Sequence, residues 1–189
     1  YSAPTFADID NDGNLDAFIG KFIGNIDHYE YNSTTEQFEP IVTVKTSDGS
    51  TIDSGNNSSP VLVDIDGDDD FDLFVGGTSS VNGGVLYYEN IGDAQNPSFE
   101  QRTGVDKPLN QVDVYDGPTD FNNLRPFFKF LITSSVVPTF GDVDGDGDYD
   151  ALVGAGDGKL YYYDNVGDAQ NPVFELETDD TLIFNNNNV

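Results

Sequence analysis

Aspartate recurs at fixed spacing in three nine-residue segments of this chain, residues 8–16, 64–72 and 142–150. Counted from its first aspartate, each segment carries acids at positions 1, 3, 5 and 9. A hard cation such as Ca²⁺ takes roughly six to eight oxygen ligands at about 2.3–2.6 Å and tolerates irregular geometry. Without a cation, so many carboxylates in one short turn would repel one another. The spacing therefore predicts three Ca²⁺ sites.

The candidate ligands are the residues at positions 1, 3, 5, 7 and 9 of each segment. In chain order they are Asp8, Asp10, Asp12, Asn14, Asp16, Asp64, Asp66, Asp68, Asp70, Asp72, Asp142, Asp144, Asp146, Asp148 and Asp150. Position 7 is expected to contribute its backbone carbonyl, and position 9 is expected to close the site. A solvated acidic turn is the alternative for one such segment, and three copies in one register argue against it.

These segments are not EF-hands, because an EF-hand needs a bidentate Glu at position 12 and that position is apolar in all three copies. Position 6 must turn sharply, and a positive φ there suits Gly13 and Gly147. Asp69 occupies this position in the second segment. Asp tolerates the left-handed region better than most residues, so we expect the second site to be kept with some strain.

The composition is strongly acidic, with 35 Asp and Glu against 7 Lys and Arg and a formal net charge of −28. Because each ion adds two positive charges, three bound Ca²⁺ would leave −22 of the −28. Such a surface repels nucleic acids and anionic membranes. It favours solubility in salty, calcium-rich surroundings. We therefore expect an extracellular or cell-surface location, with no nucleic-acid partner.

Other features of the chain agree with this expectation. It has no cysteine and no apolar run as long as a membrane helix, so no membrane insertion is expected. It begins at Tyr1 and carries no signal peptide. These features predict a processed or excised segment of a larger protein.

The repeat extends beyond the acidic segments. Each segment follows a proline and a short apolar strand, at residues 3–7, 59–63 and 137–141. Each is followed by an apolar strand that ends in glycine, at residues 17–20, 73–76 and 151–154. A tyrosine-rich third strand (26–31, 85–89, 160–164) and a fourth strand near 37–39, 96–100 and 171–175 complete each unit. Runs that are apolar at nearly every position predict strands covered on both faces.

Four short antiparallel strands per unit predict an all-β chain made of three four-stranded β-propeller blades. Residues 1–189 form a single propeller region, with blade 1 at about 1–58, blade 2 at about 59–114 and blade 3 at about 136–189. Residues 115–135 are an aromatic-rich insertion, expected to act as an interface or cap or, alternatively, as a ligand-binding loop.

The pattern Pro-x-Phe-x-Asp-x-Asp-x-Asp-Gly-x-x-Asp-x-x-x-Gly, followed by a Tyr-Tyr-Glu-Asn strand, resembles the FG-GAP/VCBS repeat. Such repeats are similar to the calcium-binding blades of integrin α-subunit propellers and occur in many large surface proteins of bacteria and algae. The resemblance implies that the acidic loop joins the first and second strands of a blade at one propeller face. It also implies coordination by Asp8, Asp10, Asp12 and Asp16 and by their counterparts in the other two loops.

Three blades cannot close a ring, since propellers usually have about four to eight. An open wedge would leave apolar blade flanks exposed, which a soluble monomer rarely tolerates. We therefore expect either a fragment of a longer propeller or completion by further chains, as a closed ring or a filament.

No catalytic constellation is evident, because the basic residues are few and His28 is the sole histidine. His28 stands where the other units carry tyrosine, and a structural or surface role is expected for it rather than a catalytic one. The tyrosines are expected to pack in the core rather than to stack on sugars.

These observations together predict a non-enzymatic, calcium-binding module of adhesion, matrix or filament assembly that acts through protein–protein contacts. One alternative is a calcium-dependent, lectin-like propeller that binds surface glycans. A second alternative is the non-catalytic propeller portion of a polysaccharide-active enzyme.

Overall fold

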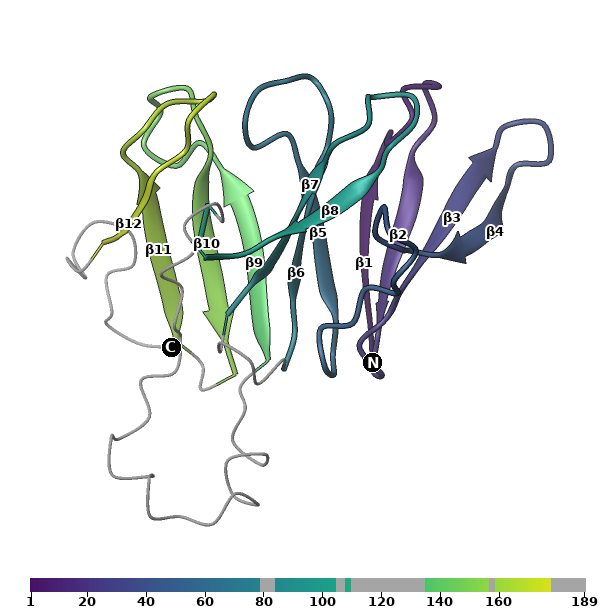
Figure 1. The fold of residues 1–189 in the computed structure, drawn as a ribbon, viewed down its shortest axis with the longest axis horizontal. Helices are drawn as coiled ribbons and strands as arrows, with labels where there is room; N and C mark the ends of the chain where they lie inside the picture. The colour runs from purple at the N-terminus through teal and green to yellow at the C-terminus, as the bar shows by residue number, and fades with distance from the viewer. Residues whose placement is uncertain (79–83, 105–107, 110–134, 157–158, 178–189) are drawn as a thin grey trace, which may run out of the picture.

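The computed structural model describes residues 1–78, 84–104, 108–109, 135–156 and 159–177. These residues form three four-stranded antiparallel sheets and no α-helix, as Figure 1 shows. None of the described segments is therefore a helix able to cross a membrane. The prediction of an all-β chain with three four-stranded antiparallel units is confirmed. The insertion at 115–135 lies outside the described residues except for Ser135.

Each sheet is a meander in which consecutive strands pair. Sheet 1 contains β1 (Ser2–Ala7), β2 (Asp16–Lys21), β3 (Ile26–Asn32) and β4 (Gln37–Thr43). Sheet 2 contains β5 (Ser59–Val63), β6 (Asp72–Gly76), β7 (Leu86–Asn90) and β8 (Phe99–Arg102). Sheet 3 contains β9 (Val136–Gly141), β10 (Asp150–Ala155), β11 (Leu160–Asn165) and β12 (Phe174–Leu176). The predicted strands are all present, with shifted ends in the fourth strand of each sheet.

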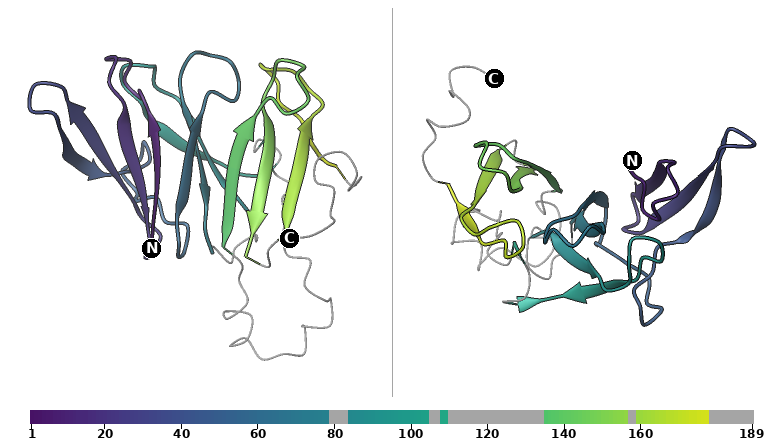
Figure 2. Two further views of the ribbon diagram at one scale, coloured as in Figure 1. Left: turned by 180° about the vertical axis from the view of Figure 1, so that it is seen from behind. Right: turned by 90° about the horizontal axis from the view of Figure 1, so that it is seen from above.

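The three sheets stand side by side in chain order (Figure 1). Strand β1 lies against β5, and β5 lies against β9, so the first strands of the sheets are neighbours. Seen from above in Figure 2, the sheets fan outward from these first strands towards β4, β8 and β12. The fan is open, because sheets 1 and 3 each have only one neighbouring sheet within the described residues.

Each sheet has two apolar faces, which the strand register distinguishes. One face carries the proline of the first strand, which is Pro4, Pro60 or Pro138, and we call it the proline face. The opposite face carries the glycine near the end of the second strand, which is Gly20, Gly76 or Gly154. We call this the glycine face.

The proline face of each later sheet packs against the glycine face of the sheet before it. Between sheets 1 and 2, Phe18 and Ile26 meet Leu73, Val75 and Tyr88 in one buried cluster. The segment that links these sheets adds the buried side chains of Val44 and Ile52 to the same cluster.

The second cluster repeats this arrangement between sheets 2 and 3. Phe74 and Tyr87 from the glycine face of sheet 2 meet Val153 and Tyr163 from sheet 3. The Phe74 ring lies 4.5 Å from that of Phe140, centroid to centroid. Sheet 2 is therefore buried on both faces, as its continuous apolar strands predict.

The same backbone contact holds both pairs of sheets together. A Cβ atom added to Gly20 would overlap the carbonyl oxygen of Ser58 and lie 2.7 Å from Pro60 Cδ. At Gly76 an added Cβ would overlap the carbonyl oxygen of Val136 and lie 2.7 Å from Pro138 Cδ. Only glycine permits this approach, because any side chain there would push the sheets apart.

A backbone hydrogen bond repeats beside each of these glycines. The Ser58 N–H donates to the Lys21 carbonyl at 3.1 Å, and the Val136 N–H donates to the Gly77 carbonyl at 3.3 Å. In both cases the donor lies two residues before the proline and the acceptor directly follows the glycine. The two interfaces are thus geometric copies of one another.

We predict that Gly20→Ala and Gly76→Ala each destabilise the fold, because the new methyl group would meet a backbone carbonyl that cannot move aside. Overpacking of this kind typically costs about 1–3 kcal/mol. Gly141→Ala is the matched control, since an added Cβ there meets nothing within 4 Å. Urea unfolding of the three variants measures the effect, and equal midpoints for all three would contradict this account of the interfaces.

Candidate metal centres in the three acidic loops

The three acidic segments form the loops that join the first and second strands of each sheet. Loop 1 (residues 8–15) joins β1 to β2, loop 2 (64–71) joins β5 to β6, and loop 3 (142–149) joins β9 to β10. Because the sheets repeat with the same strand directions, all three loops lie at one end of the molecule, at the top of Figure 1. Position 9 is the first residue of the second strand in each case.

The backbone of each loop turns through the left-handed region at two places. At position 6, φ is 90° in Gly13, 71° in Asp69 and 103° in Gly147. The predicted positive φ is therefore confirmed in all three loops, including the aspartate. Position 4 is also left-handed, and it is occupied by Asn11, Gly67 and Gly145. The sequence carried this second signal, since Asn and Gly are the residues that tolerate such a φ.

The carboxylate at position 1 organises each loop by accepting backbone N–H groups from within it. Asp8 accepts from Asp12 and Gly13, each at 3.0 Å. Asp64 accepts from Gly67, Asp68 and Asp69 at 2.8–3.2 Å. Asp142 accepts from Gly145 at 2.7 Å.

These bonds curl each loop around its first aspartate and bring further carboxylates together. One oxygen from each of three acids lies within 4.8 Å of the others in every loop. The groups are Asp8, Asp10 and Asp12 in loop 1, Asp64, Asp66 and Asp68 in loop 2, and Asp142, Asp144 and Asp150 in loop 3. Two ligands on opposite sides of a Ca²⁺ ion are about 4.8 Å apart. Each group could therefore hold a metal ion.

The position-9 aspartates are buried and tie the loops to the sheets. Asp72 accepts the Asn90 N–H at 2.7 Å and the Tyr87 hydroxyl at 3.0 Å. Asp150 accepts the N–H groups of Val143 and Asn165, both at 2.9 Å. Burial raises the pKa of Asp72 to about 8. Its charged form is thus disfavoured unless a positive charge is close by.

At position 7, loops 2 and 3 each contain a buried carboxylate oxygen that no protein group satisfies, Oδ1 of Asp70 and Oδ1 of Asp148. Burial, helped by the charges of Asp68 and Asp66, raises the pKa of Asp70 to about 6. The Asn90 amide lies close enough to favour the charged form, but it forms no hydrogen bond of good geometry with Asp70. Buried, unpaired carboxylate oxygens fit a bound cation.

Position 7 of loop 1 differs, because its amide donates to a neighbouring acid. Asn14 Nδ2 lies 2.9 Å and 3.0 Å from the two carboxylate oxygens of Asp12. The expectation that position 7 contributes its backbone carbonyl stays a prediction. The side chains of Asp70 and Asp148 are additional candidate ligands that the backbone argument did not require.

Sheet 1 also departs from the other sheets around its position-9 aspartate. Asp16 Oδ2 accepts the Ile9 N–H at 3.3 Å, but Oδ1 is buried without a partner. His28, which aligns with Tyr87, stacks on Phe18 and leaves its Nε2 3.8 Å from that oxygen. Burial lowers the pKa of His28, so the neutral imidazole is favoured.

The Glu30 carboxyl lies in the same group as Asp16 and His28. Burial and the neighbouring charge of Asp16 raise the pKa of Glu30 to about 7. Sequence reasoning missed Glu30, because only the register of β2 against β3 brings it to the loop. The role of His28 stays a prediction, and its ring stacks on the buried Phe18.

Comparison with models of protein families found no match, and comparisons with curated proteins and with solved structures found none either. The assignment of the fifteen candidate ligands to calcium therefore stays a prediction. The arrangement of their carboxylates is what supports it.

We predict that Tyr87→Phe destabilises the protein, because Asp72 would lose a buried hydrogen-bond donor. Leaving a buried acceptor unsatisfied typically costs about 1–3 kcal/mol. Tyr161→Phe is the control, since the Tyr161 hydroxyl is buried without a hydrogen-bond partner and its removal leaves no acceptor unsatisfied. Denaturant unfolding in EDTA measures both variants, and equal losses of stability would contradict this reading of Asp72.

We predict the opposite effect for His28→Tyr in sheet 1. A tyrosine at this position would place a hydroxyl donor beside the unpaired Asp16 oxygen, as Tyr87 does for Asp72. The expected gain in unfolding free energy is about 1 kcal/mol. The measurement is the same unfolding experiment, with His28→Phe as a control that fills the space without a donor. A gain in the phenylalanine variant as large as in the tyrosine variant would assign the effect to packing.

Proposed function

We propose that the chain is a calcium-binding β-propeller module in which each sheet is one blade and each acidic loop holds one Ca²⁺ ion. The observation that carries the proposal is threefold repetition of one loop backbone with a carboxylate cluster beside it. The cluster uses positions 1, 3 and 5 in loops 1 and 2, and positions 1, 3 and 9 at loop 3. Each loop has two left-handed turns, a position-1 carboxylate bonded to the loop backbone, and a cluster of three carboxylate oxygens. A solvated acidic turn has no reason to bury carboxylate oxygens without partners.

Calcium suits these loops better than magnesium. Mg²⁺ demands near-ideal octahedral geometry and keeps several waters, whereas Ca²⁺ accepts many carboxylate oxygens in an irregular arrangement. Extracellular calcium modules bind with dissociation constants of about 10⁻⁴–10⁻³ M, which extracellular fluid or seawater satisfies and resting cytosol does not. We therefore propose an extracellular or cell-surface role in adhesion, matrix or filament assembly rather than catalysis.

The role of the metal in this proposal is structural. Position 9 begins the second strand of each blade, so a cation at the loop would fix the strand that supplies much of the buried core. Binding that requires the folded loop adds its free energy to the stability of the fold. The module would then present rigid surfaces to other proteins only where calcium is abundant.

Calcium binding can be tested by isothermal titration calorimetry and thermal melting in calcium, magnesium and EDTA. We expect three bound Ca²⁺ per chain. At a calcium concentration a hundredfold above the dissociation constant, each site adds about 2.7 kcal/mol. The melting temperature should then rise by roughly 5–10 °C for each site. Magnesium at the same concentration should give a much smaller shift.

Variants in one loop sharpen this test. The double variant Asp64→Asn and Asp66→Asn should reduce the stoichiometry from three ions to two and leave the other sites intact. The double variant Glu36→Gln and Glu175→Gln is the charge-matched control, because both side chains are exposed and lie outside the acidic loops. Equal melting temperatures in calcium and EDTA for the unaltered chain would refute the proposal.

A further inference from the structure

The two interfaces inside this chain show which contacts cover the face of a blade. Each joins a glycine face to a proline face through the Gly20–Pro60 or Gly76–Pro138 contact and one backbone hydrogen bond. Two faces in the described residues have no such neighbour, the proline face of sheet 1 and the glycine face of sheet 3. One is of the proline type and the other is of the glycine type, so together they match the two sides of the interfaces seen inside the chain.

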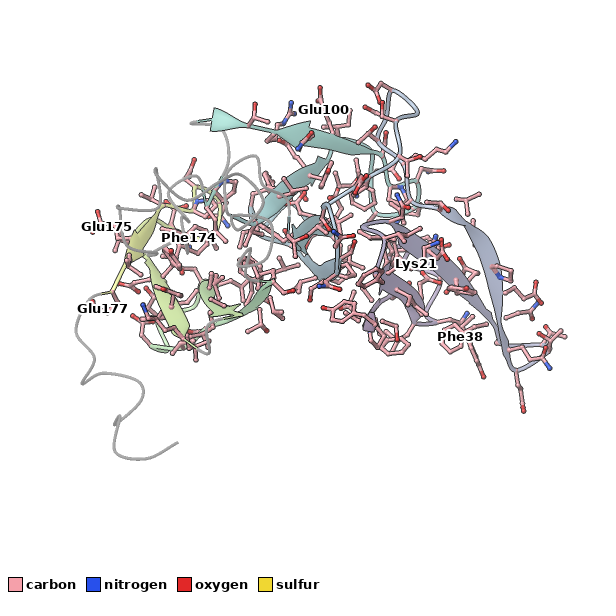
Figure 3. All side chains as sticks on the ribbon, turned by 90° about the horizontal axis from the view of Figure 1, so that it is seen from below. Lys21, Phe38, Glu100, Phe174, Glu175 and Glu177 are labelled. Atoms are coloured by element: carbon pink, nitrogen blue, oxygen red, sulfur yellow. The ribbon has the colours of Figure 1, made fainter. Side chains whose placement is uncertain are left out.

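The proline face of sheet 1 exposes side chains that the other sheets bury. Phe38 pairs with Tyr31, as Phe99 pairs with Asn90 in sheet 2 and Phe174 with Asn165 in sheet 3. Phe38 is 44% exposed, whereas Phe99 and Phe174 are 4% and 6% exposed. Figure 3 labels Phe38 and Phe174 on the two end sheets.

Neighbouring residues extend this exposed surface. Phe6, which is 53% exposed, lies 6.0 Å from the Phe38 ring, and Tyr31 lies 5.2 Å from it, centroid to centroid. In sheet 3 the residue that corresponds to Phe6 is Phe140, which packs against the core. The proline face of sheet 1 thus presents a contiguous aromatic patch.

The glycine face of sheet 3 shows the complementary exposure. Leu160 is 47% exposed, whereas the corresponding Ile26 and Val85 are fully buried. An added Cβ at Gly154 would meet only Val137, with its carbonyl oxygen at 3.7 Å and its Cβ at 4.0 Å. Within a single chain, therefore, nothing in the described residues requires glycine at position 154.

We propose that the glycine face of sheet 3 in one copy of this chain docks on the proline face of sheet 1 in a second copy. Gly154 then receives Pro4 of the second copy, just as Gly20 receives Pro60 and Gly76 receives Pro138. The Ser2 N–H of the second copy corresponds to the donors Ser58 and Val136, and the Ala155 carbonyl of the first corresponds to their acceptors. This inference rests on the blade assignment in the proposed function and not on the calcium sites.

The two docking faces differ, so the contact is head-to-tail. A head-to-tail contact leaves one free face at each end of the pair. It therefore continues until the assembly closes into a ring, or it extends as a filament. The faces that meet inside the chain already show that this pairing buries aromatic side chains such as Phe99 and Phe174.

Charge opposes the association and sets the conditions for testing it. Each copy carries a formal charge of −28, so two copies repel one another at low salt. At an ionic strength of about 0.15 M the screening length falls to about 8 Å, which confines repulsion to the contact itself. On the proline face of sheet 1, Asp27 is already paired with Lys21 at 2.8 Å.

The experiment is sedimentation velocity of the full 189-residue chain in calcium and about 0.15 M salt. We expect species larger than a monomer, whose proportion grows with protein concentration. Gly154→Ala should raise the dissociation constant at least tenfold, because the methyl group would meet the backbone of the docking blade. Its melting temperature as a dilute monomer should be unchanged. Gly141→Ala is the matched control on the same face, since the corresponding Ala7 and Val63 carry side chains within covered interfaces.

Charge-insertion variants test the direction of the contact. Phe38→Asp and Leu160→Asp should each be monomeric, whereas Ile91→Asp, at an apolar site of similar exposure outside both faces, should associate normally. An equimolar mixture of Phe38→Asp and Leu160→Asp retains one intact face from each copy. It should form a one-to-one pair that grows no further.

Three outcomes would overturn the proposal. They are a monomer at every concentration, association that Gly154→Ala leaves unchanged, and a mixture that shows no pair. A monomer that still binds calcium and melts higher in its presence would refute the docking while leaving the calcium sites in place. Loss of calcium binding with retained head-to-tail association would refute the calcium sites alone.

Discussion

A sheet with apolar side chains on both faces is stable in water only between two neighbours. Sheet 2 meets this requirement, because Leu73 and Phe74 are adjacent in β6, point to opposite faces and are both fully buried. Each such side chain contributes about 1.5–3 kcal/mol when it leaves water. The distance between sheets is then set by the backbone, since Gly20 and Gly76 admit the next strand where any side chain would hold it away. The whole arrangement depends on this close stacking.

Most of the fold could be predicted because its signals are local and repeated. Proline before each acidic segment, glycine after it and unbroken apolar runs between them fixed the strands and their order. Positive φ at position 6 was foreseen even for Asp69, because glycine occupies the same position in the other two loops. The register of β3 against β4 shifts between His28 and Tyr29. This shift was not foreseen, because it depends on how two strands pair and not on the sequence of either one.

The sequence predicted the carboxylates of the candidate sites. It did not predict which groups hydrogen-bond to them or which residues of neighbouring strands lie beside them. Spacing alone gives an oxygen-bearing side chain at every second position, but it does not tell which oxygens already accept hydrogen bonds from the backbone. Asp64, for example, uses both of its oxygens to accept N–H groups of its own loop, whereas Asp70 keeps a buried oxygen unpaired. Glu30 lay outside the pattern altogether, because strand register rather than sequence spacing brings it beside Asp16. Contacts between residues on different strands therefore cannot be predicted from sequence spacing.

A chain of side-chain contacts connects the acidic loop of sheet 2 to its packed face. The charge state of the loop can therefore affect the packing between sheets. In sheet 2, Asp72 directly follows the acidic loop and accepts the Tyr87 hydroxyl. The Tyr87 ring packs on Phe74 at 4.7 Å, and Phe74 packs on Phe140 of the next sheet at 4.5 Å. A cation that stabilises the charged form of Asp72 would hold Tyr87 in place and, through it, the packing between sheets. Without such a cation, burial raises the pKa of the Asp72 carboxyl to about 8, so a neutral acceptor for the Tyr87 hydrogen bond is favoured at neutral pH. Hydrogen bonds to charged groups are stronger than those to neutral groups. Binding of a cation at the loop should therefore stabilise the packing between sheets more than it stabilises the pairing of strands within a sheet.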